Sequence, residues 1–372
     1  MFRKVIHSNN VLIRGVKADA KSIRSSWNFR YINDVLKDNS NNEHSLLIFG
    51  GILDRTKWLN IDDIKCLVVP CLKIGLSGND GIIFPLVRVS KLLSDFTLIQ
   101  HKPYTLAAFF VNLNISKEIV RMSWTHGDSF PTLMKVFAPL NLRYRLLGYL
   151  EQDLLSFNSV HLCGSVFERD YLLSMGFKNA ILYKGGLSGR YMESSTTSNI
   201  SDSVIRLIYV GKYYNAKGLK SLLDSLKELD SKRIILRCFG DRISNFPEGY
   251  SSLEHIEIHG RISHKEVLSQ LQISDYLVLP TELGSRVHVV GGIGHVVLEA
   301  MSLGIGVISN NLVHFSGDLT ELDNVVIPYN DLKSCLKALK KNSRQDPAEL
   351  FNVYGPSVSA IELDNAVERA FK

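Results

Sequence analysis

The sequence predicts an α/β protein of two domains, each a parallel β-sheet with helices on both faces. Three observations support this prediction. The chain has 372 residues, enough for two domains of ordinary size. Short β-rich runs alternate with helical stretches, which is typical of parallel sheets. One stretch at 193–203, ESSTTSNISDS, interrupts this alternation and is typical of a linker, because it is rich in Ser and Thr and lacks apolar periodicity.

The first domain is expected to span residues 1–192. Its first helical stretch places Ile23, Trp27, Tyr31 and Val35 on one face at four-residue spacing. The β-rich runs of this domain are KVIHSNNVLI, HSLLIFGG, IKCLVVPCL, DFTLIQH and EIVRMSWTHGD.

The second domain is expected over residues 203–355, with the alternation of a mononucleotide-binding, Rossmann-like unit. A helix at about 356–372 should follow and pack back on the first domain. Ligands of open parallel sheets bind outside the carboxyl ends of the strands. Two Rossmann-like domains facing across a cleft would therefore hold two ligands, which favours a two-substrate enzyme over a simple binder. The elements of the second domain are VIRLIYVGK, GLKSLLDSLKEL, RIILRCFGD, HIEIHG, SHKEVLSQLQIS, DYLVLPT and IGVISNN.

Composition narrows the class of protein. Hydrophobic residues make up 45% and the formal net charge is +6, which fits either an ordinary basic enzyme or one drawn to an anionic surface or ligand. No basic run with interleaved aromatic residues supports a nucleic-acid partner. The apolar run near 107–111 is too short to cross a bilayer, and the N-terminus has no signal-peptide core. Five scattered cysteines without Cys-x-x-Cys spacing predict reduced thiols in a cytoplasmic protein.

A glycine-rich segment, GGIGHVVLEAM, precedes a predicted helix. Helix N-termini bind anions through unpaired N–H groups, and Gly292 and Gly294 would let a phosphate approach the backbone closely. The alternative is a tight turn that binds nothing. A dinucleotide-binding oxidoreductase is disfavoured, because Val297 occupies the place of the third glycine.

Two lysines follow a predicted strand in VGKYYNAKG. Lys212 and Lys217 come just after Gly211, where cations are well placed to neutralise a diphosphate. The alternative is a pair of solvated loop lysines.

These segments carry a resemblance to a known family. YVGKYYNAKGLKSLLDSL, SDYLVLPT and GHVVLEAMSLGIGVISN occur in the order found in retaining glycosyltransferases of the GT-B fold, and they resemble glycosyltransferase family 4. SWTHGD and SVFERDYLLSMGFKNAILYKGGL resemble first-domain segments of that family, so the likeness covers most of residues 95–310.

The resemblance implies roles in binding a nucleotide-diphosphate sugar. Lys212 and Lys217 would contact the donor diphosphate, and Glu299 would accept bonds from the ribose hydroxyls. Gly294 and His295 would lie beside the diphosphate and the sugar.

Further donor and sugar contacts are also implied. Gly211 and Gly292 would flank the donor, and Gly15 would approach the phosphate from the first domain. His126 would sit near the reacting sugar, where it could position the sugar or shuttle a proton, with Asp128 orienting it or capping the next helix.

The chain departs from the family where the donor sugar should lie. Gly291 occupies the position of the family's first Glu, and the adjoining loop is longer. Glu282 or Arg286 could fold back to contact the sugar instead. The departure also supports a second hypothesis, a non-catalytic GT-B-fold protein that binds a nucleotide or serves a partner enzyme.

The predicted reaction needs no metal and no cofactor. The chain lacks any Asp-x-Asp, so lysines and a helix N-terminus would stabilise the leaving diphosphate. Retention of configuration is implied by the family alone. The remaining histidines lack metal spacing and are expected to be surface or packing residues; they are His101, His161, His259, His264, His288 and His314.

The basic and apolar stretch LMKVFAPLNLRYRLLGYLEQDLLSF, with Lys135, Arg143 and Arg145, predicts either core helices or a membrane-contacting surface. The resemblance implies a glycosyltransferase, and the prevalence of the family in bacterial surface polysaccharide synthesis suggests a role in making O-antigen or capsule. It would use a saccharide or lipid-linked acceptor, in the cytoplasm or at the inner face of the plasma membrane.

Overall fold

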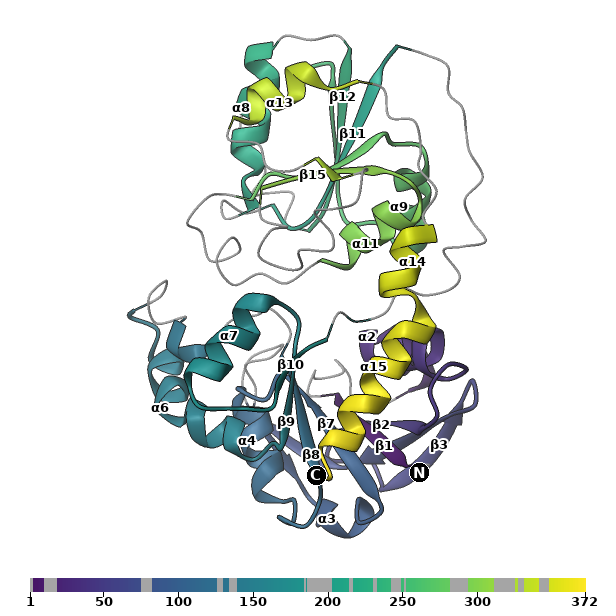
Figure 1. Ribbon diagram of the computed structural model, residues 1–372, viewed down its shortest axis with the longest axis vertical. Helices are drawn as coiled ribbons and strands as arrows, with labels where there is room; N and C mark the ends of the chain where they lie inside the picture. The colour runs from purple at the N-terminus through teal and green to yellow at the C-terminus, as the bar shows by residue number, and fades with distance from the viewer. Residues whose placement is uncertain are drawn as a thin grey trace. The chain divides into compact units, whose positions relative to one another are not determined.

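The computed structural model divides the chain into two compact units (Figure 1). The first comprises residues 1–189 and 354–372, and the second comprises residues 190–353. The structure describes residues 3–9, 19–74, 82–125, 130–133, 139–183, 185, 203–213, 217–229, 233–241, 249–250, 252–281, 294–310, 325–326, 331–340 and 348–372.

The first unit is built on an eight-stranded sheet in the order β10-β9-β8-β7-β1-β2-β4-β3. All neighbours pair in parallel except β3, an antiparallel edge strand that the sequence pattern did not reveal. The predicted parallel α/β architecture is therefore confirmed, although the parallel strands β9 and β10 were also not among the predicted runs. The strands are β1 (Lys4–Asn9), β2 (Glu43–Phe49), β3 (Lys57–Ile61), β4 (Ile64–Val69), β7 (Phe96–His101), β8 (Arg121–Thr125), β9 (Val160–Cys163) and β10 (Ala180–Leu182).

The run predicted as one strand after residue 64 splits at a proline. β4 ends at Val69, Pro70 follows, and β5 (Cys71–Ile74) leaves the main sheet to pair with β6 (Ile82–Pro85) in an antiparallel hairpin. Proline has no N–H to donate to a ladder, which makes it a natural point of departure.

The first helical stretch folds as three short pieces: α1 (Ala20–Ser25), α2 (Trp27–Tyr31) and the π-helix η1 (Ile32–Leu36). Ser26 causes the first break, because its backbone is extended and its hydroxyl accepts a bond from the N–H of Phe29, capping α2. Ile23, Tyr31 and Val35 are nevertheless buried, so the four-residue periodicity identified the core-facing side correctly. The other helices of this unit before its C-terminal segment are α3 (Val89–Leu92), α4 (Leu106–Leu113), α6 (Leu142–Ser156) and α7 (Val166–Ser174).

The second unit holds a six-stranded parallel sheet in the order β13-β12-β11-β14-β15-β16. Counted along the unit, this is the 3-2-1-4-5-6 order of a doubly wound sheet, with its switch point between β11 and β14. The strands are β11 (Ile205–Val210), β12 (Ile234–Phe239), β13 (Ile256–His259), β14 (Tyr276–Leu279), β15 (Gly306–Ser309) and β16 (Val325–Val326).

Helices cover both faces of this second sheet (Figure 1). α8 (Leu219–Leu229) and α13 (Leu332–Ala338) pack together on one face, where Leu222, Leu226 and Leu336 join the core. α9 (His264–Gln272) and α11 (His295–Ser302) contact each other and the strands β11, β14 and β15. The predicted helices and strands of this domain are thus present.

The chain ends in α14 (Ala348–Tyr354) and α15 (Pro356–Arg369), the second drawn in yellow in Figure 1. α15 contacts η1 and β9, and it buries Leu363 and Val367 in the core of the first unit. All five cysteines are free thiols. Within the described part of the chain, every helix is too short or too polar to traverse a lipid bilayer.

Candidate functional site

The carboxyl edge of the second sheet gathers several of the residues that the sequence singled out. Gly211 and Lys212 directly follow β11, and Lys217 lies in the turn before α8. Gly294, His295 and Glu299 belong to the start of α11, in the connection between β14 and β15. Since β11 and β14 are neighbours at the switch point, both groups lie where ligands of such sheets bind.

A close backbone approach shapes this edge. A Cβ atom added at Gly240, which follows β12, would lie 1.7 Å from the carbonyl oxygen of Gly211. No side chain can occupy that space, so Gly240 must be glycine for the loop after β11 to turn as it does. The sequence analysis missed Gly240, although a glycine directly after a strand is a recognisable signal.

Tyr213 fixes the loop that carries Lys212. Its hydroxyl donates to the carbonyl oxygen of His259 at 2.6 Å, and its N–H donates to the carbonyl oxygen of Asp241 at 3.2 Å. Burial, with a smaller contribution from Cys238, raises the pKa of Tyr213, so the phenol keeps its proton and remains a donor. Tyr209 adds a bond from its hydroxyl to the carbonyl oxygen of Lys212 at 3.0 Å. The Lys212 side chain itself is exposed.

α11 begins at the predicted helix N-terminus. Gly294 is its N-cap, with extended backbone and no side-chain capping bond, and His295 is the first helical residue. Both are exposed, whereas the helix is buried from Val297 to Ser302. The first N–H groups of this helix are therefore presented at the sheet's carboxyl edge, with the partial positive charge of a helix start.

Glu299 is the most buried charged group of this edge. Its side chain is only 10% exposed, and its Oε1 lies 2.8 Å from Nε2 of His264. His264 was expected to be a surface or packing residue, and its side chain is indeed 42% exposed. Its bond to Glu299 was not predicted from the sequence. The available signal was the capping pattern SHKE, which places His264 at the first position of α9.

In the first unit, the corresponding edge is organised by a buried carboxylate. Oε2 of Glu168 accepts from the hydroxyl of Thr125 at 2.6 Å and from the N–H of Gly164 at 2.8 Å. Thr125 ends β8, directly before the predicted sugar-contacting His126. Glu168, which the sequence did not single out, therefore holds the strand end from which His126 emerges.

A chain of buried histidines crosses the switch point of the first sheet, where β1 and β7 are neighbours. His7 Nδ1 lies 3.3 Å from His101 Nε2, and His7 Nε2 lies 3.0 Å from His44 Nδ1. His44 Nε2 lies 2.8 Å from the hydroxyl of Ser40, which donates to Asp364 of α15 at 2.6 Å. These side chains are all buried or nearly so. Burial lowers the pKa of His7 well below its usual value, and it lowers that of His44 to about 4 against the opposing pull of Asp364.

Several predicted site residues lie outside the described residues, so the structure neither places them nor brings them together with the others. They are Gly15, His126, Asp128, Glu282, Arg286, Gly291 and Gly292. Within the described part of the chain, no group of three or more His, Cys, Asp or Glu side chains is arranged so that it could hold a metal ion.

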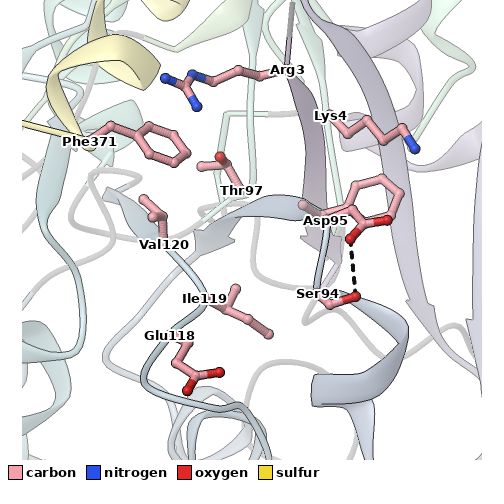
Figure 2. Close-up of a pocket in the computed structure, with 10 residues that line it drawn as sticks. Arg3, Lys4, Ser94, Asp95, Thr97, Glu118, Ile119, Val120 and Phe371 are labelled. Carbon is pink, nitrogen blue, oxygen red and sulfur yellow. Dashed lines mark hydrogen bonds between the residues drawn. The ribbon is translucent and has the colours of Figure 1, made fainter.

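A hollow of about 360 Å³ in the first unit lies at the opposite edge of its sheet (Figure 2). Lys4 and Phe96 begin the parallel strands β1 and β7, so this hollow opens at their amino ends. The guanidinium of Arg3 lies 3.5 Å from the ring centre of Phe371 and pairs with Glu368. These contacts fasten the C-terminus, and we assign no ligand to the hollow.

Comparison with known proteins gives a family match in the second unit. Residues 193–350 match the family described as "Glycosyl transferases group 1". A curated relative from Klebsiella pneumoniae, an uncharacterized 41.2 kDa protein in the cps region, is 20% identical over 166 residues. That match covers 44% of this chain and 44% of the relative, so the chain matches less than half the length of that protein.

Solved structures match the whole chain. A glycosyltransferase from Rickettsia africae aligns with a TM-score of 0.64 at 15% identity, covering 100% of this chain and 99% of that one. The apo form of the lipopolysaccharide outer core galactosyltransferase WaaB aligns with a TM-score of 0.59 at 16% identity, covering 99% of both chains. Anabaena HepE in complex with UDP and glucose aligns with a TM-score of 0.59 at 11% identity, covering 98% and 99%. These likenesses establish the fold.

Proposed function

We propose that this chain is a glycosyltransferase of the group 1 family, which its residues 193–350 match, and that it transfers a sugar from a nucleotide-diphosphate donor to a saccharide or lipid-linked acceptor. The transfer proceeds with retention of configuration and without a metal ion.

The observation that carries this proposal is the arrangement at the carboxyl edge of the second sheet. Two lysines, Lys212 and Lys217, lie between the end of β11 and the start of α8, and a helix start without a side-chain cap lies between β14 and β15. A buried carboxylate, Glu299, lies one turn into that helix. Cations and helix N–H groups suit a diphosphate, and a fixed carboxylate suits the paired hydroxyls of a ribose.

The chemistry follows from where charge develops. Breaking the bond between the anomeric carbon and the diphosphate leaves negative charge on the departing phosphate oxygens. Lys212, Lys217 and the N–H groups near Gly294 stabilise that charge, so they act more strongly in the transition state than in the bound donor. The acceptor hydroxyl attacks from the face the diphosphate leaves, and its proton passes to the departing phosphate.

The sugar and the acceptor are assigned to the residues near the first unit's carboxyl edge and the loop before α11. His126 positions the donor sugar or shuttles a proton, with Asp128 orienting it, and Glu282 or Arg286 takes the place of the Glu that Gly291 replaces. Gly15 and Gly292 let the backbone approach the phosphates.

We assign the reaction to bacterial surface polysaccharide synthesis in the cytoplasm. The support is the curated relative in a cps region and the likeness to a lipopolysaccharide galactosyltransferase. Contact with the inner face of the plasma membrane is supported by α6, which exposes Leu142, Leu146 and Tyr149 along one side together with Arg145. α6 as a whole carries two arginines and two acidic residues, so it has no net charge, and it is the exposed apolar stripe beside Arg145 that fits a lipid surface. Sedimentation with anionic vesicles, compared with a Leu142→Ser, Leu146→Ser variant, tests this part.

The central test is release of nucleoside diphosphate from a panel of UDP- and GDP-sugars without acceptor. Slow release by the wild type and none by Lys217→Ala is the expected result. Strict dependence on added Mg²⁺ or Mn²⁺, abolished by EDTA, would contradict the metal-independent mechanism.

A second candidate function is a non-catalytic nucleotide-binding or partner protein of the same fold. Gly291 favours it, because the carboxylate that family members place near the donor sugar is missing. Under this alternative the protein binds a nucleotide but releases none from any sugar donor, which the same assay detects.

A further inference from the structure

His264 occupies a position fixed by its own helix. Ser263 and Glu266 form a reciprocal capping box at the start of α9: the Ser263 hydroxyl accepts from the N–H of Glu266 at 3.3 Å, and Glu266 Oε2 accepts from the N–H of Ser263 at 2.7 Å. Because both backbone donors are satisfied, the first turn is held firmly. The imidazole of His264, 42% exposed, projects from this turn to Glu299 of the neighbouring helix α11.

Glu299 needs such a fixed neighbour. A glutamate has three rotatable side-chain bonds, and a carboxylate that is 90% removed from solvent is costly unless it is hydrogen-bonded. The 2.8 Å contact supplies a donor from Nε2 of His264, because a carboxylate oxygen accepts. The contact therefore fixes the tautomer of the imidazole and the orientation of the carboxylate together.

We propose that His264 is a positioning residue for nucleotide recognition, holding Glu299 in the orientation that receives the ribose hydroxyls of the donor. This assignment rests on the proposed function, in which Glu299 binds the ribose. His264 itself does not need to touch the nucleotide. His264 restricts the side-chain rotamers of Glu299 before the nucleotide binds, so less conformational entropy is lost on binding. Its contribution is therefore to affinity and to discrimination between ribose and deoxyribose.

The test compares three variants with the wild type by calorimetric titration with UDP, GDP and ADP and their 2′-deoxy counterparts. His264→Leu removes the donor, whereas His264→Gln keeps a side-chain N–H at a similar distance from the backbone. Lys265→Leu changes the next, exposed residue of the same turn and serves as the matched control.

The expected result for His264→Leu is about tenfold weaker binding of the preferred ribonucleotide, little change for the deoxynucleotide, and a correspondingly smaller preference for ribose. His264→Gln should restore most of both affinity and preference, and Lys265→Leu should match the wild type. A merely structural role of His264 would weaken both nucleotides alike and would leave the preference unchanged.

Two other outcomes separate this assignment from the proposed function. If the wild type binds a ribonucleotide and Glu299→Gln weakens it, but His264→Leu leaves both affinity and preference unchanged, the assignment of His264 is wrong and the proposed function stands. If the wild type binds none of the nucleotides, the proposed function is overturned and the role of His264 with it.

Discussion

The two sheets share one topology around their switch points but fill those points differently. In the first unit, the strands that meet there, β1 and β7, are bridged by His7 and His101, both buried and hydrogen-bonded to one another. In the second unit, the strand end at the switch point is followed by Gly211 and the exposed Lys212, and the next helix starts with the exposed Gly294. The switch point of the first unit is filled by its own side chains, and we call it the closed switch point. That of the second unit presents hydrogen-bond donors and positive charge at its edge, and we call it the open switch point.

At the closed switch point, the donor and the acceptor of each hydrogen bond can be assigned in turn, starting from Asp364. Ser40 donates to the carboxylate of Asp364, so its oxygen accepts from Nε2 of His44. His44 Nδ1 must then accept from Nε2 of His7, and His7 Nδ1 from Nε2 of His101. All three histidines are thereby assigned the same neutral tautomer, with the proton on Nε2. This row of hydrogen-bonded side chains joins the C-terminal helix to the centre of the first sheet, so the polar groups there stabilise the fold.

The largest expected effect is a loss of stability of the first unit on acidification, because its buried histidines must take up protons. Burial lowers the pKa of His7, His44 and His161, the last two to about 4, whereas an unfolded histidine titrates near 6.5. The unfolded state therefore binds more protons below pH 6.5, and stability present at pH 7 is lost as the pH falls. His44 and His161 should each remove about 2 kcal/mol of the free energy of unfolding between pH 7 and pH 5, and His7 should act in the same direction. Urea unfolding at both pH values measures this, and equal stabilities would contradict the account of the closed switch point.

Replacing a cation at the open switch point should abolish activity and spare the fold. Lys217→Ala should lower the rate of nucleotide release about 100- to 1000-fold, because one donor to the developing phosphate charge is lost. Lys220→Ala is the matched control, since Lys220 lies two residues into α8, 64% exposed and paired with Asp224. Equal rates for the two variants would reject the assignment of Lys217.

Removing the carboxylate of Asp364, at the closed switch point, should destabilise the fold and leave nucleotide binding unchanged. Asp364→Ala leaves the Ser40 hydroxyl, the Asn42 amide and the Asn41 N–H without their acceptor. The free energy of unfolding should fall by about 3 kcal/mol, with nucleotide affinity unchanged. Asp170→Ala, which breaks an exposed pair with Arg169 on the helix α7, should cost less than about 1 kcal/mol. If Asp364→Ala loses nucleotide affinity at unchanged stability, the assignment of a purely stabilising role to the closed switch point is wrong.

The smallest expected effect concerns the backbone contact at the open switch point. Gly240→Ala places a methyl group against the Gly211 carbonyl, so the loop carrying Lys212 must shift at a cost of about 1–3 kcal/mol. Gly260→Ala adds its methyl group in open space and should be close to neutral. Thermal unfolding measures the stability of both variants. An unchanged stability of Gly240→Ala would show that the close contact between Gly240 and the Gly211 carbonyl is not required.

Local sequence patterns predicted the parts of the molecule that depend on local chemistry. Most strands of the two sheets follow from short β-rich runs, and the start of α11 follows from its glycines. The strands β3, β9, β10 and β16 were not predicted. Contacts between distant segments were not predictable in this way. The pairing of His264 with Glu299 spans 35 residues, and that of Ser40 with Asp364 spans 324, so neither leaves a periodic signal. The break at Ser26 was missed because apolar spacing continues across it, although the serine itself was a visible cap signal.

The most direct test of the central claim is calorimetric titration of the full chain with UDP and GDP. The account predicts that one of them binds and that Lys217→Ala and Glu299→Gln each weaken it by about tenfold or more, while Asp364→Ala does not. Binding that survives both substitutions unchanged would place the nucleotide elsewhere and contradict the account.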